Sequence, residues 1–474
     1  MTNHAQHTAP PTPWTDQKYL LWLASPFLPL LGFLSLLAGY VFEQPAFYWL
    51  MPVFFYAVLP LLDWLVGTDI NNPPESAVAQ LEANRYYRAI VYAYIPAQYA
   101  TTIMAVWLAT RGDISIASII ALIFSAGLIN GVAINTAHEL GHKRADLEKW
   151  LAKIALAPVA YGHFFVEHNR GHHKNVATPR DPASSRMGET FYAFLPRTMI
   201  GSLRSAWALE GERLARQGKS VWSLENENLR AWSLTVLLFG ALTLWLGTGA
   251  LAFLAIQAFF GAALLEVVNY LEHYGLLRQW DKRTQRYERC APSHSWNSNN
   301  IVTNLLLYQL QRHSDHHANP TRRFQSLRHF DESPQLPSGY ASMLILAYIP
   351  PLWFRVMNPR VARHYNGDVT KAHLYGPKRE QLIKKWQTAT PSCPETEAPA
   401  TRPQEEQHSP NVPSASRHGC SNCGYVYDEL KGNPSEGFVP GTPWKAIPSD
   451  WSCPECAVRD KADFVPLTST AKPV

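Results

Sequence analysis

Long apolar runs recur along this chain and restrict what it can fold into. Six of them are apolar enough, and mostly long enough, to cross a bilayer as a helix, which needs about 20 residues. They cover residues 19–40, 47–66, 87–108, 114–136, 232–246 and 250–271. The mean hydropathy of −0.16 conceals them, because long polar stretches lie between them. The pattern predicts a mainly α-helical, polytopic bundle of six transmembrane helices.

Basic residues fix the expected orientation of these spans. Short translocated loops avoid Lys and Arg, and the short connections at residues 43–46, 111–113 and 247–249 carry one basic residue between them. Residues 143–230 and the chain after Arg278 are rich in Lys and Arg. We therefore expect an integral membrane protein with both termini and both long segments in the cytoplasm. No cleavable signal peptide is expected, because residues 1–17 are polar and the first apolar run is too long.

Nine of the 18 histidines fall into four short boxes, all on the predicted cytoplasmic side. Imidazole is the commonest transition-metal ligand. One ion would leave most of these rings unused, so the pattern indicates a centre with more than one metal ion. The boxes are HELGHK with His138 and His142, EHNRGHH with His168, His172 and His173, NYLEHYG with His273, and LQRHSDHHA with His313, His316 and His317.

Spacing within the boxes predicts how the rings are grouped. Histidines three or four positions apart share one helix face. We therefore expect each box to direct its histidines to one ion: His138 with His142, His168 with His172 and His173, and His313 with His316 and His317.

Four acidic residues adjoin these histidines, namely Glu139, Glu167, Glu272 and Asp315. They are candidates to accept ring N–H bonds or to offset the charge of an ion. Solvation of a helix surface explains any one of them equally well. For His163, His294 and His329, which lie outside the boxes, we favour an ordinary hydrogen-bonded or surface role.

A second metal motif lies near the C-terminus. Residues 388–417 are rich in Pro, Ser, Thr, Glu and Gln, which predicts a flexible linker without a core. Two C-x-x-C pairs follow, and four thiolates suit one tetrahedral ion. The pairs are Cys420 with Cys423 and Cys453 with Cys456. By themselves they are equally typical of a zinc ribbon. Cys290 and Cys393 are assigned no role.

The residues around the cysteines resemble rubredoxin, a one-iron electron carrier. The resemblance lies in C-G-Y-x-Y-D after the first pair, P-G-T, and W-x-C-P-x-C at the second pair, and it covers residues 418–470. It implies an Fe(Cys)4 site held by Cys420, Cys423, Cys453 and Cys456. The aromatic residues available to surround that site are Tyr425, Tyr427, Phe438, Trp444 and Trp451.

The HELGH sequence is also the signature of zinc proteases, with Glu139 as general base. An intramembrane protease would use only two of the nine histidines and one further ligand. It would also leave a fused electron carrier without a purpose, because peptide hydrolysis moves no electrons. This interpretation stays a distant alternative, as does a non-catalytic protein that stores metal or electrons.

Taken together, the four boxes resemble those of the membrane-bound, rubredoxin-dependent alkane monooxygenases, from the first span to about residue 330. The resemblance implies that residues 1–387 form a hydroxylase in which the nine histidines hold two non-haem irons, His273 being the ninth ligand. It further implies that O2 and electrons from the fused rubredoxin convert the terminal methyl of an n-alkane to a 1-alkanol. Fatty acyl desaturases and hydroxylases share eight-histidine boxes and are the close alternative.

The expected substrate and partners follow from this resemblance. An n-alkane dissolved in the bilayer would reach the metals through an apolar passage among the spans. Phe54, Phe55 and Trp64 on the second span are candidates to end that passage, and we single out Phe55. Upstream we expect a separate flavoprotein rubredoxin reductase that uses NADH or NADPH. The other expected partner is the lipid membrane, and no nucleic acid is expected.

Charge predicts how the carrier meets the hydroxylase. The whole chain has a formal charge of +5, while residues 418–474 and 388–417 each carry −2, which leaves +9 on residues 1–387. An acidic carrier domain should therefore be steered to a basic surface of the membrane domain.

Overall fold

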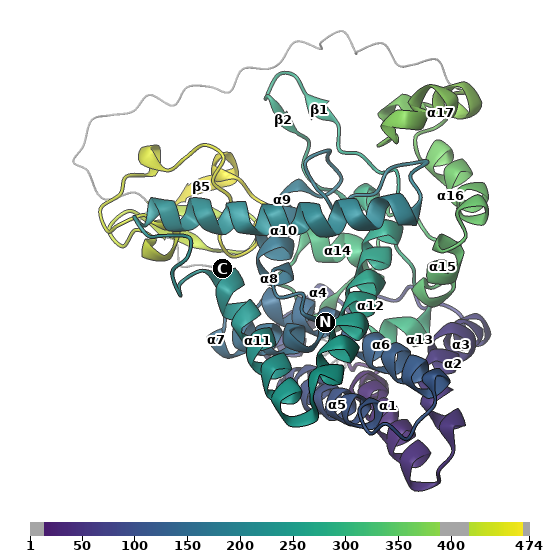
Figure 1. Cartoon of the computed structure of the whole chain (residues 1–474). Helices are drawn as coiled ribbons and strands as arrows, with labels where there is room; N and C mark the ends of the chain where they lie inside the picture. Colours follow the sequence, from purple (N-terminus) through teal and green to yellow (C-terminus); the bar gives the residue numbers. More distant parts are fainter. Residues whose placement is uncertain (1–13, 389–416, 468–474) are drawn as a thin grey trace, which may run out of the picture.

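The computed structural model of this chain describes residues 14–388 and 417–467. Six helices are long and apolar enough to cross a membrane, at Leu20–Val41, Pro45–Val66, Arg85–Ala109, Ile116–Gly141, Glu227–Leu246 and Thr248–His273. All six predicted spans are therefore confirmed. The first span contains α1 (Ala24–Val41). The third to sixth spans are α5 (Arg85–Ala109), α6 (Ile116–Gly141), α11 (Glu227–Leu246) and α12 (Thr248–His273). They gather in the lower part of Figure 1.

The second span is irregular. It consists of η2 (Pro45–Trp49), α2 (Leu50–Val53), η3 (Phe54–Val58) and α3 (Leu59–Val66), and η3 is a π-helical turn. Phe55 is buried, whereas Trp64 is 77% exposed on the surface that lipid would cover. Phe55 and Trp64 therefore have different environments although they lie on the same span.

Glycines and amides hold the central spans together. Gly131 of α6 and Gly261 of α12 face each other so closely that a Cβ at Gly131 would lie 2.9 Å from the Gly261 carbonyl oxygen. Asn130 donates to Gln257 Oε1 at 2.8 Å and accepts from Gln98 Nε2 at 3.0 Å. Small residues and interhelical amide bonds are the usual means of helix association in lipid, where burial of apolar surface gives no driving force.

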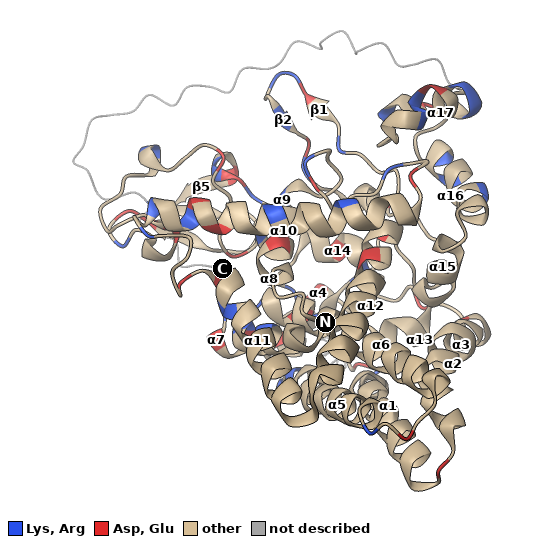
Figure 2. Ribbon diagram, in the orientation of Figure 1, with Lys and Arg blue, Asp and Glu red and all other residues tan. Residues whose placement is uncertain are grey.

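Shorter helices cover one end of the span bundle. They include α4 (Glu75–Ala83), α7 (Asp146–Leu156), α8 (Phe164–Val166), the π turn η5 (Glu167–His172) and α9 (His173–Asn175). The long α10 (Phe191–Arg216) lies across the bundle in Figure 1, with the short α14 (His313–Ala318) just below it in that view. Another short helix, α13 (Ile301–Leu306), contacts α3 of the second span. Figure 2 shows that charged residues gather in the half with α10 and are sparse along the spans.

A bent pair of helices was not predicted from the sequence. Helices α15 (Tyr340–Ala347) and α16 (Pro350–His364) together meet the apolar criterion for a span, but they are bent by 120° at the break between them. The break comes just before Pro350 and Pro351, which form the first turn of α16, a position that favours proline. Beyond them lies α17 (Arg379–Trp386), and a small hairpin of β1 (Trp280–Asp281) and β2 (Arg286–Tyr287) precedes α13.

The C-terminal domain is a three-stranded antiparallel sheet in the order β4-β3-β5, with β3 (Arg417–Cys420), β4 (Val426–Asp428) and β5 (Phe464–Leu467). His418 pairs with Tyr427 on one side and with Pro466 on the other. Three cysteines and four aromatic rings share its core. The predicted linker, Cys393 and the extreme N-terminus fall on residues outside those that the structure describes.

Candidate metal centre and substrate cavity

Nine buried histidines meet where the spans join the shorter helices. Their ring nitrogens form two groups, and the ligand atoms of each group lie within 4.8 Å of one another. We call the group of five cluster 1 and the group of four cluster 2. Cluster 1 is His138, His142, His168, His173 and His316, and cluster 2 is His172, His273, His313 and His317. These are the nine histidines of the four sequence boxes.

The second box divides between the clusters because it lies on a π turn. His172 and His173 are consecutive but belong to different clusters. Hydrogen bonds in a π turn join residues five apart, and His168 accordingly meets His173, with 3.0 Å between their Nε2 atoms. The expectation that all three histidines of this box would face one ion is therefore wrong.

The fourth box divides as well, on a regular helix. His313 and His317 are four residues apart on α14, and their Nε2 atoms approach to 2.9 Å in cluster 2. His316 points the other way, and its Nε2 atom lies 2.8 Å from that of His138 in cluster 1. The expectation holds only for the first box, in which His138 and His142 share cluster 1.

Burial disfavours the charged form of most clustered rings that lie outside the spans. It lowers the pKa of six of them well below the ordinary value of 6.5: His142, His168, His173, His313, His316 and His317. A neutral ring keeps a nitrogen lone pair for a metal. The Nε2 atoms of His142, His172 and His273 are buried without a hydrogen-bond partner, which is costly unless something binds them. The donor set therefore fits transition-metal ions.

Of the four acidic candidates, Glu272 comes nearest to its predicted role. Its Oε2 atom lies 3.1 Å from His313 Nε2, and its Oε1 atom accepts a hydrogen bond of 2.9 Å from the Tyr340 hydroxyl. Glu272 thus contacts His313 at Nε2, the same nitrogen that faces cluster 2. The Glu272 carboxylate therefore lies beside the place where an ion would bind, and not behind the ring at Nδ1.

The other three acidic candidates have different surroundings. Glu139 pairs with Lys143 at 3.1 Å, and Asp315 accepts the backbone N–H of Arg328 at 2.8 Å. Glu167 is buried at the start of the π turn, where burial raises the pKa of its carboxyl well above the usual range. A Cβ at Gly171 would overlap the Glu167 carboxylate. In the described residues none of these three carboxylates accepts a hydrogen bond from a clustered ring, and their role in offsetting the charge of an ion stays a prediction.

Sequence reasoning missed Asp181. Its carboxylate lies 3.0 Å from His172 Nδ1 and accepts a bond of 2.6 Å from the Ser184 hydroxyl. Burial alone would raise the pKa of Asp181, but His172 and the hydrogen bonds lower it below the ordinary value. A charged carboxylate behind the ring fixes the orientation of His172 and leaves Nε2 to face cluster 2. Asp181 lies in a loop with no local motif, and only the fold brings it to His172.

The three histidines for which an ordinary role was predicted, His163, His294 and His329, join neither cluster. His163 is buried and packs edge-on against Tyr161, with 4.4 Å between ring centroids. His294 contacts Glu288 at 3.2 Å, and His329 contacts Asp331 at the same distance.

The four cysteines of the C-terminal domain form a third cluster. Their sulfur atoms lie within 4.8 Å of one another, with 3.5 Å between those of Cys423 and Cys453. Tyr427, Phe438 and Trp451 are buried around them, and Tyr425 and Trp444 are half-buried in the same core. Of the four cysteines only Cys423 is not fully buried.

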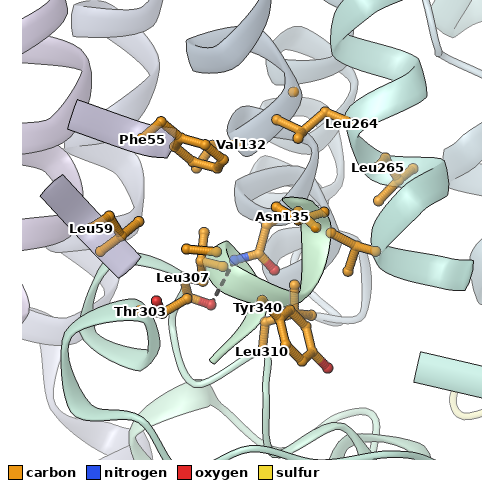
Figure 3. A pocket seen from close by; sticks show the side chains of 14 residues that line it. Phe55, Leu59, Val132, Asn135, Leu264, Leu265, Thr303, Leu307, Leu310 and Tyr340 are labelled. Atoms are coloured by element: carbon orange, nitrogen blue, oxygen red, sulfur yellow. Dashed lines mark hydrogen bonds between the residues drawn. The ribbon is translucent and has the colours of Figure 1, made fainter. Parts of the chain in front are cut away.

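An apolar cavity lies among the spans close to the histidines. Figure 3 shows Phe55 and Leu59 of the second span on one side and Leu264 and Leu265 of α12 on the other. Asn135 lies between them, one turn before His138 in α6. The free space is narrow, about 30 Å³, so an alkyl chain can extend through it only as side chains move aside. The remaining lining residues are Gly131, Val132, Val268, Thr303, Leu307, Leu310, Tyr340, Ala341 and Leu344.

The C-terminal domain lies against α10 and the β1–β2 segment through complementary charges. Glu436 of the domain pairs with Arg170 at 3.0 Å and with Arg216 at 3.3 Å. Asp463 pairs with Arg289 at 2.6 Å. The basic side of each pair belongs to the membrane domain, as the net charges predict.

A further contact joins the two metal regions. Arg144 pairs with Glu455 at 2.8 Å and donates a hydrogen bond of 2.8 Å to the backbone carbonyl of Cys423. Arg144 is two residues beyond His142 of cluster 1. The least buried of the four clustered cysteines therefore faces the membrane domain beside the histidines.

Comparison with known families agrees with this architecture. Residues 115–346 match the family described as fatty acid desaturase, and residues 417–464 match rubredoxin. Histidine clusters at the end of a span bundle, joined to a rubredoxin domain, define a histidine-box membrane oxidoreductase fused to a rubredoxin.

Relatives narrow this class. The alkane 1-monooxygenase of Acinetobacter baylyi is 50% identical over 382 residues, which cover 80% of this chain and 93% of that protein. The alkane 1-monooxygenase of Pseudomonas putida is 48% identical, with coverage of 79% and 92%. This chain belongs to the alkane 1-monooxygenase family and is an integral membrane monooxygenase. The resemblance seen in the histidine boxes is confirmed, and a zinc protease has no support from these relatives.

Proposed function

We propose that this chain hydroxylates the terminal methyl of n-alkanes to 1-alkanols, using O2 and electrons from its own rubredoxin domain. The apolar cavity among the spans, close to the histidine clusters, carries this proposal (Figure 3). An n-alkane has no polar group, so only shape and an apolar lining can orient it. A narrow cavity admits a chain by its end, which favours the terminal methyl.

We also propose one iron in each histidine cluster and one in the cysteine cluster. Bound iron would supply the ability to activate O2 for attack on an unactivated C–H bond. One oxygen atom enters the alkane and the other leaves as water, which consumes two electrons and two protons. The chain's own side chains bury the imidazoles, hold His172 through Asp181 and exclude bulk water from the cavity.

Electron delivery within one chain is supported by the contacts between the domains. The ion pairs of Glu436, Asp463 and Glu455 bring the domain to the side of the protein that carries cluster 1. We propose that residues 1–387 are the hydroxylase, residues 388–417 the linker and residues 418–470 the carrier. Such a tether keeps the carrier at a high effective concentration and lets it leave the surface to meet a NAD(P)H-dependent flavoprotein reductase.

The membrane supplies the substrate in this proposal. Three of the spans line the cavity together with the α13 and α15 segments, so an alkane dissolved in the bilayer can approach without crossing water. Charged residues gather at the end of the bundle that carries the histidines (Figure 2). By the preference of basic segments for the cytoplasm, we place that end, both termini and the metal sites on the cytoplasmic side of a bacterial inner membrane.

Phe55 is our candidate for the residue that limits chain length. It is 4% exposed and lines the cavity from the second span. Among the three aromatic candidates on that span, Phe55 is the one that lines the cavity, so Phe54 and Trp64 are set aside.

A fatty acyl desaturase or hydroxylase is the second candidate, and the match to the desaturase family is the observation that favours it. The two activities differ in substrate and product. An alkane hydroxylase converts an n-alkane to a 1-alkanol, whereas an acyl enzyme oxidises an acyl lipid and leaves the alkane unchanged.

The deciding experiment uses the full-length protein in membranes with NADH and a rubredoxin reductase. We expect 1-alkanol from octane or dodecane, and three irons per chain, one for each cluster. Formation of oxidised acyl chains without alkanol would replace the proposal by the second candidate. Zinc in place of iron, without alkanol, would overturn both.

A further inference from the structure

We propose that Asp63 is a positioning residue that sets the width of the substrate cavity by tying the second span to α13. The inference rests on the proposed alkane hydroxylation and deepens it. Asp63 does not itself line the cavity. It acts on the residues that do.

Asp63 occupies an unusual place for a carboxylate. It lies within the second span, one turn beyond Leu59, and is fully buried, while the next residue, Trp64, is 77% exposed. An ionisable group inside a membrane span is costly unless it is hydrogen-bonded, and such groups often mark functional sites. Leu59 and Phe55 precede it on the same span and line the cavity.

The Asp63 carboxylate joins two segments that line the cavity, the second span and α13. Its Oδ1 atom accepts the backbone N–H of Thr303 at 2.9 Å, and its Oδ2 atom accepts the Thr303 hydroxyl. Thr303 is in the first turn of α13, whose N–H groups have no partner within the helix. Thr303 and Leu307, which lies just beyond the end of α13, also line the cavity, near Leu59 of the second span (Figure 3).

Two neighbouring contacts keep this tie in place. Asn300 donates from Nδ2 to the backbone carbonyl of Asp63 at 3.1 Å. Gly339 packs against the carboxylate so closely that a Cβ there would overlap Oδ2. The next residue, Tyr340, lines the cavity. Asp63 thus contacts both segments that face the second span, the start of α13 and the start of α15.

The narrowness of the cavity makes this spacing important. With only about 30 Å³ free, a small outward movement of Phe55 and Leu59 changes what fits and how firmly its end is held. In an apolar pocket, a difference of one methylene group changes the kcat/KM ratio of two competing substrates about tenfold. Loosening the tie should therefore admit bent or displaced chains and lower the preference for the terminal methyl.

The test compares full-length Asp63→Ala, Asp63→Asn and Ser125→Ala in membranes, given a mixture of n-alkanes. Products are quantified by chain length and hydroxyl position. We expect Asp63→Ala to raise the ratio of subterminal to terminal alcohol about tenfold. Asp63→Asn should keep the wild-type ratio, because the amide oxygen can accept the Thr303 N–H and the amide nitrogen can donate to the Thr303 hydroxyl.

Ser125→Ala is the matched control. Ser125 is buried and donates to the backbone carbonyl of Tyr48 at 2.8 Å, so it holds the other end of the same span away from the cavity. Its replacement should lower stability without changing the product ratio. An unchanged ratio in Asp63→Ala, or a ratio changed equally by Ser125→Ala, would overturn the proposed role.

If Asp63→Ala does not fold, as judged by size-exclusion chromatography, Thr303→Val replaces it. That variant removes the hydroxyl bond, keeps the N–H bond and should shift the ratio in the same direction by a smaller factor. No shift in a folded Thr303→Val would overturn the inference. Absence of alkanol from the wild-type protein would instead refute the proposed function, so the two failures are distinguishable.

Discussion

His172 and His173 are consecutive residues whose ring nitrogens belong to different histidine clusters. The π turn η5, which ends at His172, allows His168 to meet His173, while Asp181 contacts the His172 ring through Nδ1. The two clusters are therefore linked by a single peptide unit. Any displacement of this turn moves one ligand of each cluster at the same time.

This arrangement predicts that His172→Ala and His173→Ala remove different ions. Each variant should lose about one equivalent of iron, because a cluster that lacks a ligand binds its metal more weakly. Iron per chain and Mössbauer spectra would show which environment is lost, with the rubredoxin iron as an internal standard. His163→Ala, at a buried histidine outside the clusters, should lose none. Identical spectra for the first two variants would contradict separate sites.

Asp181→Asn should weaken metal binding at cluster 2. The amide of asparagine is uncharged, so it is a weaker acceptor for the His172 N–H than the Asp181 carboxylate. Loss of a carboxylate partner of a ligand histidine costs about 10–100-fold in metal affinity or activity. Competition with a chelator would measure the change. Asp368→Asn is the control, since Asp368 is also buried but caps the short helix η8 (Val369–Lys371). Equal iron loss from both variants would assign Asp181 to general stability.

Reversing the charge of Glu436 should slow electron transfer from the rubredoxin domain. Glu436→Arg would face Arg170 and Arg216, so docking is repelled and the effect weakens as salt screens it. Stopped-flow oxidation of the reduced domain would measure the rate. Glu380→Arg, at an exposed carboxylate on α17, should leave the rate unchanged. A rate independent of both salt and Glu436 would show that these ion pairs do not guide transfer.

Cys453→Ser in the full-length chain should remove the rubredoxin iron and leave the histidine clusters loaded. The sulfur of Cys453 is one of four close ligands, and serine is a poor ligand for this site. Turnover with NADH and reductase should stop and return when separate rubredoxin is added. Failure of added rubredoxin to restore a variant with normal iron in its histidine clusters would contradict the carrier role.

Much of the architecture could be predicted from the sequence because the bilayer imposes it. A span needs a long apolar run, so all six were found. The pair α15 and α16 was missed because each helix is short and prolines separate them. Likewise, the boxes identified all nine clustered histidines, since a protein rarely needs so many imidazoles in short motifs for any purpose but metal binding.

The division of those histidines into two clusters could not be predicted from their spacing in the sequence, for a physical reason. Helical spacing predicts one face for His168 and His172, but a π turn changes the period locally and its sequence carries no distinct signal. Asp181, Asp63 and Tyr340 acquire their roles through contacts between distant segments. No spacing along the chain reveals such partners.

Replacing Phe55 should change the range of alkanes that are hydroxylated. Phe55→Ala opens space at the wall of the second span, so longer chains should gain relative to shorter ones. Phe55→Trp should have the opposite effect. One methylene group of pocket space changes the kcat/KM ratio of two alkanes about tenfold. Because Phe55→Ala removes a whole ring, the preferred alkane should become longer by several carbons. Competition among n-alkanes in one reaction, with alcohols quantified by chain length, measures this directly.

Trp64→Ala is the matched control, because Trp64 is on the same span but 77% exposed. Its removal should lower membrane anchoring without moving the optimum. The products also distinguish the role of Phe55 from that of Asp63. A smaller side chain at position 55 should lengthen the cavity while hydroxylation stays at the terminal carbon. Loss of the Asp63 contacts should instead lower the preference for the terminal carbon. If Phe55→Ala yields the wild-type range with ordinary activity, the chain end does not reach Phe55, and the limit on length lies deeper, among Leu264, Leu265 and Leu344.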